Sequence, residues 1–315
     1  MPRMIEVSDL TGTHRVRARL GFLAPRYWPT WAALGVLRLT LYLPLRVRAW
    51  LGQRLGDLYC RSNHKRRRIA TINIALCFPS WTPEQQQMAV RQHFRLAAQA
   101  VFHIAVLWWG SEQAIDRCLR VKGLHHYREA KAAGHNVIVL HCHSLGLEAS
   151  LVLSRYFPYV GFMKSLKNPV LDFVMTRGRE RFGGRVFDRR SGLRPLIRAI
   201  QGGLGASYIP DEDLGPKESV YAPFFGVPAA TLPTLGRLAR ITHAVVIPCF
   251  TKLLPEGGCE MWLEPPMASF PTGSALGDAT AMNAAIERAI LIMPEQYMWT
   301  MKRFKTRDDG VSPYE

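Results

Sequence analysis

The feature that most constrains this chain is an apolar run of nineteen residues, 27–45, which lies inside its most basic region. The run is apolar except for Arg38 and the small polar residues Thr30 and Thr40. As a single helix it would be about 28 Å long, which is close to the hydrocarbon thickness of a bilayer. The run therefore predicts an N-terminal membrane-anchoring helix within a basic segment, residues 1–52.

Two placements of this helix in the membrane stay open. A spanning helix would carry Arg38 near its centre, at a cost of roughly 2.5–3.5 kcal/mol. An interfacial helix would let Arg38 reach the headgroups while Trp28 and Trp31 enter the acyl region. A buried core helix is a weaker alternative, and a signal peptide fits poorly because no small-residue cleavage site follows the run. Basic residues flank the run on both sides, so the sequence predicts no orientation.

Positive charge is concentrated near the N-terminus. The net charge is +17, and residues 1–70 supply fourteen Lys or Arg against three acids, which is +11 of the total. Such a balance predicts an anionic partner, whether nucleic acid, an anionic membrane or an acidic carrier. The basic run 64–68 is typical of nucleic-acid patches, but few aromatic residues interleave with it, so we expect no nucleic-acid partner.

The rest of the chain predicts an α/β fold in which a sheet is flanked by helices. Thr82, Pro83 and Glu84 form a helix-start signal, and a long buried helix is expected from there to about residue 109. Beyond residue 118, short apolar runs alternate with amphipathic stretches. The expected strands are 137–140, 159–163, 205–209 and 244–250, and the expected helices are 145–156, 168–181, 191–201, 231–240 and 278–293. Without a long linker, we expect residues 53–315 to form one domain.

A loop rich in reactive groups follows the strand expected at 137–140. It contains His143 and Glu148, and a His beside a carboxylate can take a proton from an alcohol while the carboxylate stabilises the imidazolium. Chance alone gives about one such pair in a chain of this composition, so the spacing is weak evidence. A buried His that hydrogen bonds near a helix start is the structural alternative. A metal site at His141 and His143 is less well supported, since no further ligands stand at suitable spacing.

A second acidic loop contains Asp211 and follows the strand expected at 205–209. Adjacent acids usually form a solvated surface, but an inward Asp211 would pair with an arginine or orient a substrate. Arg179 lies in a basic segment that is typical either of a helix end or of an anion clamp. The six Cys form no C-x-x-C pair, which favours a reducing compartment and no zinc cage. Neither a G-x-S-x-G nor a phosphate-binding P-loop sequence is present.

These residues belong to blocks that, in this order, resemble the bacterial lipid A biosynthesis lauroyl/myristoyl acyltransferases, within the lysophospholipid acyltransferase superfamily. The resemblance covers about residues 24–310. The blocks are APRYWPTW from residue 24, RIATINIALCFP from 68, His143-x4-Glu148, TRGR from 176, PDEDLG from 210, APFF from 222, PEQYMW from 294 and RFKTR from 303. His141, and Met301 with Lys302, depart from the usual pattern of that family.

The resemblance implies a mixed sheet of the glycerolipid-acyltransferase type and an acyl transfer at the cytoplasmic face of the bacterial inner membrane. The donor would be acyl carrier protein, and the acceptor a hydroxyl on a 3-hydroxyacyl chain of a Kdo-bearing lipid A precursor. His143 would be the general base, and Glu148 would orient it. Arg179 would bind an anionic group or the oxyanion, and Asp211 would hold Arg179. No cofactor or metal is expected.

Two other functions remain open from the sequence. A glycerolipid acyltransferase of the lysophospholipid type would share the His-x4-Glu chemistry but use other acceptors. A non-catalytic basic protein at the membrane surface would need neither His143 nor Glu148.

Overall fold

The computed structural model describes residues 10 and 12–315, so most of the first eleven residues of the expected N-terminal basic segment lie outside the described part. Its centre is a seven-stranded sheet with the order β1-β9-β8-β2-β5-β3-β4. All neighbouring strands are parallel except β8 and β9, which are antiparallel. A mixed sheet is therefore confirmed. The strands are β1 Leu119–Lys122, β2 Asn136–Leu140, β3 Tyr159–Met163, β4 Arg185–Asp188, β5 Gly205–Tyr208, β8 Ala244–Leu253 and β9 Cys259–Leu263.

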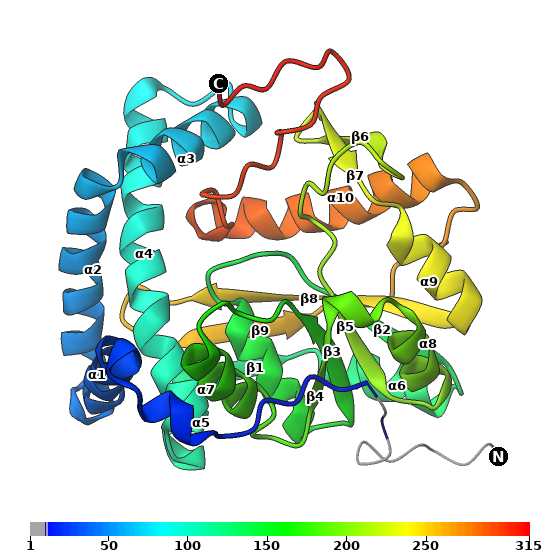
Figure 1. Ribbon diagram of the computed structural model, residues 1–315. Coiled ribbons are helices and arrows are strands. Elements are labelled where there is room, and N and C mark those ends of the chain that lie inside the picture. The colour runs from blue at the N-terminus through cyan, green and yellow to red at the C-terminus, as the bar shows by residue number, and fades with distance from the viewer. Residues whose placement is uncertain (1–9, 11) are drawn as a thin grey trace.

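Helices cover the sheet and one of its ends, as Figure 1 shows. α10 packs against α9 and against a separate antiparallel hairpin, β6 with β7, while α2, α3 and α4 stand together at one end of the sheet. The helices are α1 Trp28–Leu39, α2 Leu45–Ser62, α3 His64–Cys77, α4 Pro83–Trp109, α5 Glu112–Cys118, α6 Leu124–Ala132, α7 Pro169–Arg179, α8 Arg194–Gln201, α9 Thr234–Thr242 and α10 Ala275–Ile292; the hairpin is β6 Val220–Phe224 and β7 Val227–Thr231.

The core lies on both faces of the sheet, and β2 shows why the apolar runs predicted strands. Ile138 and Leu140 belong to one buried cluster, whereas Val137 and Val139 belong to the other. Because side chains of a strand alternate between faces, a continuous apolar run is what a strand buried on both sides requires. The four predicted strands are confirmed as β2, β3, β5 and β8.

The predicted helices are confirmed with one change of type. α4 begins with a capping box between Thr82 and Gln85 and ends at Trp109. The helices expected near 168–181, 191–201, 231–240 and 278–293 are α7 to α10. The helix expected at 145–156 is instead a 3₁₀ helix, η5, at Leu147–Arg155.

The prediction of one continuous helix over residues 27–45 is wrong. α1 ends at Leu39, a 3₁₀ turn follows at Thr40–Tyr42, and α2 begins at Leu45. The cause is Pro44, because the residue before a proline is disfavoured in helical conformation, and Leu43 is accordingly extended with φ −82° and ψ 140°. Among the described residues, no helix has the length and apolar character that crossing a bilayer would need.

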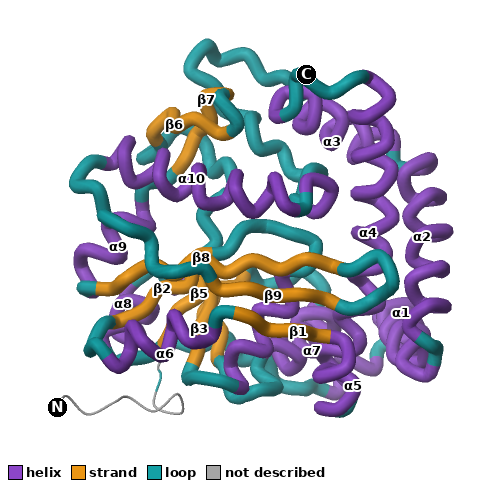
Figure 2. The backbone as a smooth tube through the Cα atoms, turned by 180° about the vertical axis from the view of Figure 1, so that it is seen from behind, coloured by secondary structure: helices purple, strands orange, loops and turns teal. Residues whose placement is uncertain are grey.

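α2 and α4 lie side by side in both views (Figures 1 and 2), and glycines set their distance. A Cβ atom on Gly52 would come within 2.8 Å of the backbone of Gln99, and one on Gly56 within 2.4 Å of the backbone of Arg95. Only glycine allows so close an approach of two helices. The boundary expected at residue 52 falls within α2, and the division into segments 1–52 and 53–315 stays a prediction.

Candidate active site

His143 lies in the loop that leaves the carboxyl end of β2. A C-terminal segment holds this loop in place: the Met298 N–H donates to the His143 carbonyl at 2.7 Å, and the Leu145 N–H donates to the Gln296 carbonyl at 2.8 Å. Between these two bonds Ser144 forms a β-bridge with Tyr297. The backbone on which His143 sits is therefore fixed from the far end of the chain.

Asp211 is the carboxylate that contacts His143. Its Oδ1 lies 2.7 Å from Nδ1 of His143, and its Oδ2 accepts from the His143 backbone N–H at 2.8 Å. β2 and β5 are parallel neighbours, so the loops that follow them meet at one edge of the sheet. Asp211 is completely buried, while the His143 side chain is 26% exposed. No hydrogen bond to Nε2 of His143 is found among the described residues, so this nitrogen is free to receive a proton.

Asp211 also sets the protonation of the pair. Burial alone would lower the pKa of His143, but the charge and the hydrogen bond of Asp211 outweigh it, so the pKa lies above the usual 6.5. Burial would raise the pKa of Asp211, yet His143 opposes this and the pKa lies below 3.8. The arrangement stabilises an imidazolium, which is the species a general base becomes once it accepts a proton.

Glu148 contacts Arg179. The Arg179 guanidinium donates to both carboxylate oxygens of Glu148, at 3.0 Å and 2.7 Å. Trp108 of α4 donates its indole N–H to the same carboxylate at 3.0 Å. Gly178, the residue before Arg179, makes room for this tryptophan, because a Cβ atom there would lie 2.4 Å from the Trp108 ring. The T-R-G-R block thus supplies both the charged Arg179 and the small Gly178 that lets α7 pack closely against α4.

The partners expected from the sequence are therefore exchanged. Glu148 was expected to orient His143 and Asp211 to hold Arg179, but the hydrogen bonds join His143 to Asp211 and Arg179 to Glu148. The cause is local geometry. Glu148 lies in the first turn of η5, where it faces α4 and α7, while Asp211 already accepts from both the ring and the backbone of His143.

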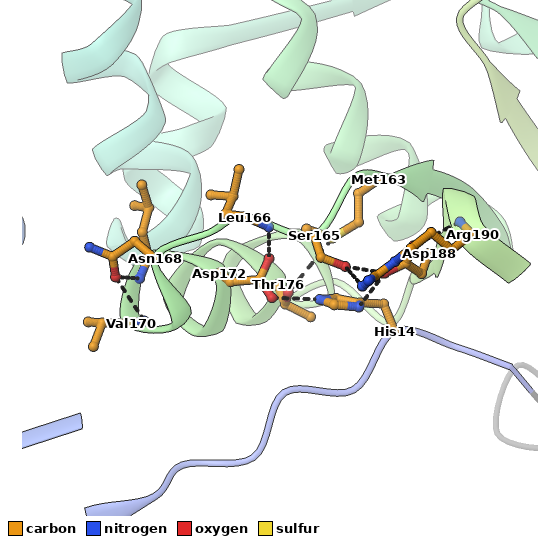
Figure 3. A network of polar contacts seen from close by, with 11 residues as sticks. His14, Met163, Ser165, Leu166, Asn168, Val170, Asp172, Thr176, Asp188 and Arg190 are labelled. Atoms are coloured by element: carbon orange, nitrogen blue, oxygen red, sulfur yellow. Dashed lines mark hydrogen bonds and ion pairs between the residues drawn. The ribbon is translucent and has the colours of Figure 1, made fainter. Parts of the chain in front are cut away.

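The start of α7, the helix that ends at Arg179, is fixed by a polar network (Figure 3). The Asn168 side chain accepts from the backbone N–H groups of Val170 and Leu171. His14 of the N-terminal segment contacts Asp172 of α7 through Nε2 at 2.9 Å, and lies 3.6 Å from Asp188 at the end of β4. These contacts position the helix that carries Arg179.

Glu148 and Arg179 face a small cavity of about 60 Å³ between η5 and strands β3 to β5. Leu147, Leu151 and Phe162 contribute apolar walls. The second pair thus borders a partly open, largely apolar space, whereas His143 does not line this cavity.

Both ring nitrogens of His141 have hydrogen-bond partners in the protein, so His141 is not placed to bind a metal ion. Its Nδ1 lies 2.8 Å from the Cys249 carbonyl, and its Nε2 lies 2.7 Å from the Tyr159 hydroxyl. Burial lowers the pKa of His141 to about 4, so it is neutral. Among the described residues, the groups close enough to share a metal ion are His125, His126 and Glu129 on α6.

Sequence reasoning from residue types missed Arg303 and Tyr297. Arg303 is 1% exposed and donates to the Ala230 carbonyl and to the Thr231 hydroxyl, and its charge helps to lower the pKa of Asp211. Tyr297 is fully buried, and the charge of Asp211 adds to the effect of burial in raising its pKa. The available signal was their place in the PEQYMW and RFKTR blocks, which carried no chemistry without the fold.

The sequence of the chain is similar to that of known proteins over most of its length. The sequence profile of the family described as bacterial lipid A biosynthesis acyltransferase matches residues 17–306. The chain is 34% identical to a lipid A biosynthesis acyltransferase of Haemophilus influenzae, over 98% of this chain and 100% of that protein. It is 35% identical to the lipid A biosynthesis lauroyltransferase of Escherichia coli K12, over 92% and 95%, and 32% identical to the myristoyltransferase of that strain, over 93% and 92%.

Proposed function

The chain belongs to the bacterial lipid A biosynthesis acyltransferase family, and we propose that it moves a fatty acyl chain from acyl carrier protein to a hydroxyl group of a lipid A precursor. The acceptor hydroxyl lies on a 3-hydroxyacyl chain of a Kdo-bearing precursor. The observation that carries the proposal is the His143–Asp211 pair, whose Nδ1 to Oδ1 distance of 2.7 Å leaves Nε2 available.

The transfer proceeds in one attack without an acyl-enzyme. Nε2 of His143 takes the proton of the acceptor hydroxyl while its oxygen attacks the thioester carbonyl. The carbon–sulfur bond then breaks, and the imidazolium returns its proton to the departing thiolate. Asp211 stabilises the imidazolium throughout, because its carboxylate is buried against Nδ1 and the backbone N–H of the same residue.

The second pair acts on the charge that develops on the carbonyl oxygen. The Arg179 guanidinium is the donor for this oxyanion. Glu148 binds Nε and one terminal nitrogen of Arg179, which leaves the other terminal nitrogen for the reaction. Glu148 is thus a positioning residue for Arg179.

The enzyme works at the cytoplasmic face of the inner membrane, with α1 lying in the interface. Trp28 and Leu39 of α1 are 62% and 63% exposed, and Leu20 just before it is 89% exposed. Large apolar side chains are this exposed in a folded protein where they meet a membrane or another partner. The net charge of +17 suits an anionic bilayer, a phosphorylated acceptor and an acidic carrier protein.

The test is transfer by the purified protein from acyl-acyl carrier protein to a Kdo-bearing lipid A precursor, with the product identified by mass spectrometry. We expect the mass of the acceptor to rise by one acyl group, with loss of the product in His143→Gln. Transfer to lysophospholipids or glycerol phosphate in place of the lipid A precursor would favour a glycerolipid acyltransferase. Full turnover by the His143 variant would contradict the proposed base.

A further inference from the structure

A second and larger cavity, which His143 does not line, lies where the first turns of α3 face the C-terminal segment. Its volume is about 350 Å³. In Figures 1 and 2, α3 stands beside the C-terminus of the chain, at the end of α2 that lies opposite α1. The lining residues are His64, Lys65, Arg68, Ile69, Ile72, Lys302 and Tyr314.

The rim of this cavity carries positive charge that the described residues leave uncompensated. Within the described part of the chain, Lys65, Arg68 and Lys302 form no ion pair with an Asp or Glu side chain. Arg68 donates to the backbone carbonyl of Tyr314 and to a main-chain oxygen of Glu315, the last residue of the sequence, so the uncompensated charge is that of Lys65 and Lys302. The side chains of Lys65 and Lys302 make no hydrogen bond within the same described residues.

The position of the charge on α3 adds to the imbalance. Lys65 and Arg68 lie at the N-terminal end of a fourteen-residue helix whose first turn contains no acidic residue. The positive end of a helix dipole disfavours cations and attracts anions. An anion in the cavity would therefore relieve repulsion from both the side chains and the helix.

The floor of the cavity is apolar. Ile69 is 4% exposed, Ile72 packs against the main core cluster, and the ammonium group of Lys302 lies 5.5 Å from the centre of the Tyr314 ring. A cationic rim over an apolar floor suits a phosphate that carries an organic group better than a bare ion.

The cavity also lies at one end of a surface that extends along α2. Val47, Trp50 and Leu58 are exposed on this helix, and Arg54 and Arg61 are exposed among them. Both views place α2 on the outer side of α4, with α1 at one end and α3 at the other. Apolar and arginine side chains mixed along one face are typical of a helix that lies on an anionic bilayer.

We propose that the cavity between α3 and residues 302–314 binds the phosphate of an anionic phospholipid headgroup while the outer face of α2 lies on the bilayer. The assignment rests on the proposed function only in taking the membrane as the working surface. Lys65, Lys302 and Arg68 contact the phosphate, and the glycerol end of the headgroup lies over Ile72 and Tyr314.

The test compares binding of the full chain to vesicles of phosphatidylcholine with and without phosphatidylglycerol. In Lys65→Gln/Lys302→Gln, we expect binding to the phosphatidylglycerol vesicles to weaken about 30-fold, from two cations near an anionic surface. Arg120→Gln/Arg128→Gln is the matched control, because it removes the same charge from exposed positions on β1 and α6. The control should weaken binding less than about twofold.

A third variant separates the cavity from general attraction. Ile72→Trp keeps the charge and fills the cavity, so it should reduce the response to phosphatidylglycerol and leave binding to pure phosphatidylcholine unchanged. Equal losses in the lysine variant and the control, or no effect of either cavity variant, would overturn the proposal.

Activity in neutral detergent identifies the source of the bound phosphate. The lysine variant should keep wild-type kcat and KM with detergent-dispersed substrates. A raised KM for the lipid acceptor there would assign the cavity to the acceptor, and lost binding to acyl carrier protein with normal vesicle binding would assign it to the carrier. Either result would contradict the bilayer assignment. An inactive wild-type protein would contradict the proposed function. The vesicle measurements would still decide whether the cavity binds a phospholipid headgroup.

Discussion

The edge of the sheet carries two acid–base pairs, and they differ in whether the base can lose its proton. Asp211 contacts an imidazole, which titrates near neutral pH, whereas Glu148 contacts a guanidinium, which stays charged at any pH the protein survives. The first pair can therefore move a proton, and the second can supply only a fixed charge. Burial alone is thus not enough to identify a catalytic carboxylate. The group that the carboxylate contacts decides whether the pair can move a proton.

The two pairs also differ in how far apart their members lie along the chain. Asp211 is 68 residues from His143, and Glu148 is 31 residues from Arg179, although His143 and Glu148 are close neighbours in sequence. A short motif can therefore contain members of two different pairs. The proton-moving pair, His143 with Asp211, and the fixed-charge pair, Arg179 with Glu148, should therefore respond differently to mutation and to pH.

The largest effect is expected from His143→Gln. Loss of the base should lower kcat by about 10³–10⁴-fold, measured as acyl transfer from acyl carrier protein. Glutamine is preferred to alanine because its amide can still hydrogen bond to the buried Asp211. His125→Gln, on the exposed face of α6, is the matched control and should keep full activity. A near-normal rate in folded His143→Gln would show that neither pair moves the proton.

Asp211→Asn should have the next largest effect, about 10²–10³-fold on kcat, together with a change in the pH profile. In the wild type, His143 must be unprotonated to act, and Asp211 raises its pKa, so kcat/KM should rise with pH through a value above 6.5. Without the Asp211 charge, burial is the largest remaining influence and lowers the pKa of His143, so this rise should move to lower pH.

Glu148→Gln is the comparison for that profile. Glu148→Gln should leave unchanged the pH at which kcat/KM rises. The described hydrogen bonds of Glu148 go to Arg179 and Trp108, and none goes to His143. If Glu148→Gln shifted the rise and Asp211→Asn did not, the roles assigned to the two carboxylates would be reversed.

The fold was largely predictable from the sequence because its central strands are buried on both faces. β2 and β8 are continuous apolar runs, and such runs predict strands without any alternation. β1 and β4 have only four residues each and lie at the edges of the sheet, so they contain too few apolar positions to be detected. The break after α1 was missed because hydrophobicity was weighed above the proline at residue 44.

The members of the candidate site were predictable, but their pairing was not. His143 and Asp211 each follow a predicted strand, and strand ends are where sites gather in α/β sheets. Which carboxylate reaches the imidazole depends on strand order, and β2 beside β5 is a tertiary fact. The contacts between residues 296–298 and the loop that carries His143 were even harder to predict from the sequence, because they join segments about 150 residues apart.

For the fixed-charge pair, the main effect is expected on stability. Glu148→Gln leaves the Arg179 guanidinium largely buried without its counter-charge, and we expect a loss of about 2–3 kcal/mol in the free energy of unfolding, since both side chains keep some solvent exposure. Urea denaturation measures it. Glu148→Gln/Arg179→Gln should be less destabilised than the sum of the two single variants. Simple additivity would mean that the pair contributes no coupling.

The smallest effect separates the pairs by how stability depends on pH. His143 has a folded pKa above its unfolded value, so its contribution is fully present below about pH 6.5 and is lost as pH rises through the folded pKa. Asp211 has a folded pKa below its unfolded value, so its contribution is present above about pH 4 and is lost as pH falls through the folded pKa. Between these limits the ion pair is intact in the folded protein.

The Tm of the wild type should therefore fall more than that of His143→Gln when pH rises from 6 to 9. Glu148→Gln should follow the wild type across the same range, because Arg179 does not titrate there. Parallel Tm curves for the wild type and His143→Gln would mean that Asp211 does not hold a protonated imidazole, and the distinction between the two pairs would fail at its most direct point.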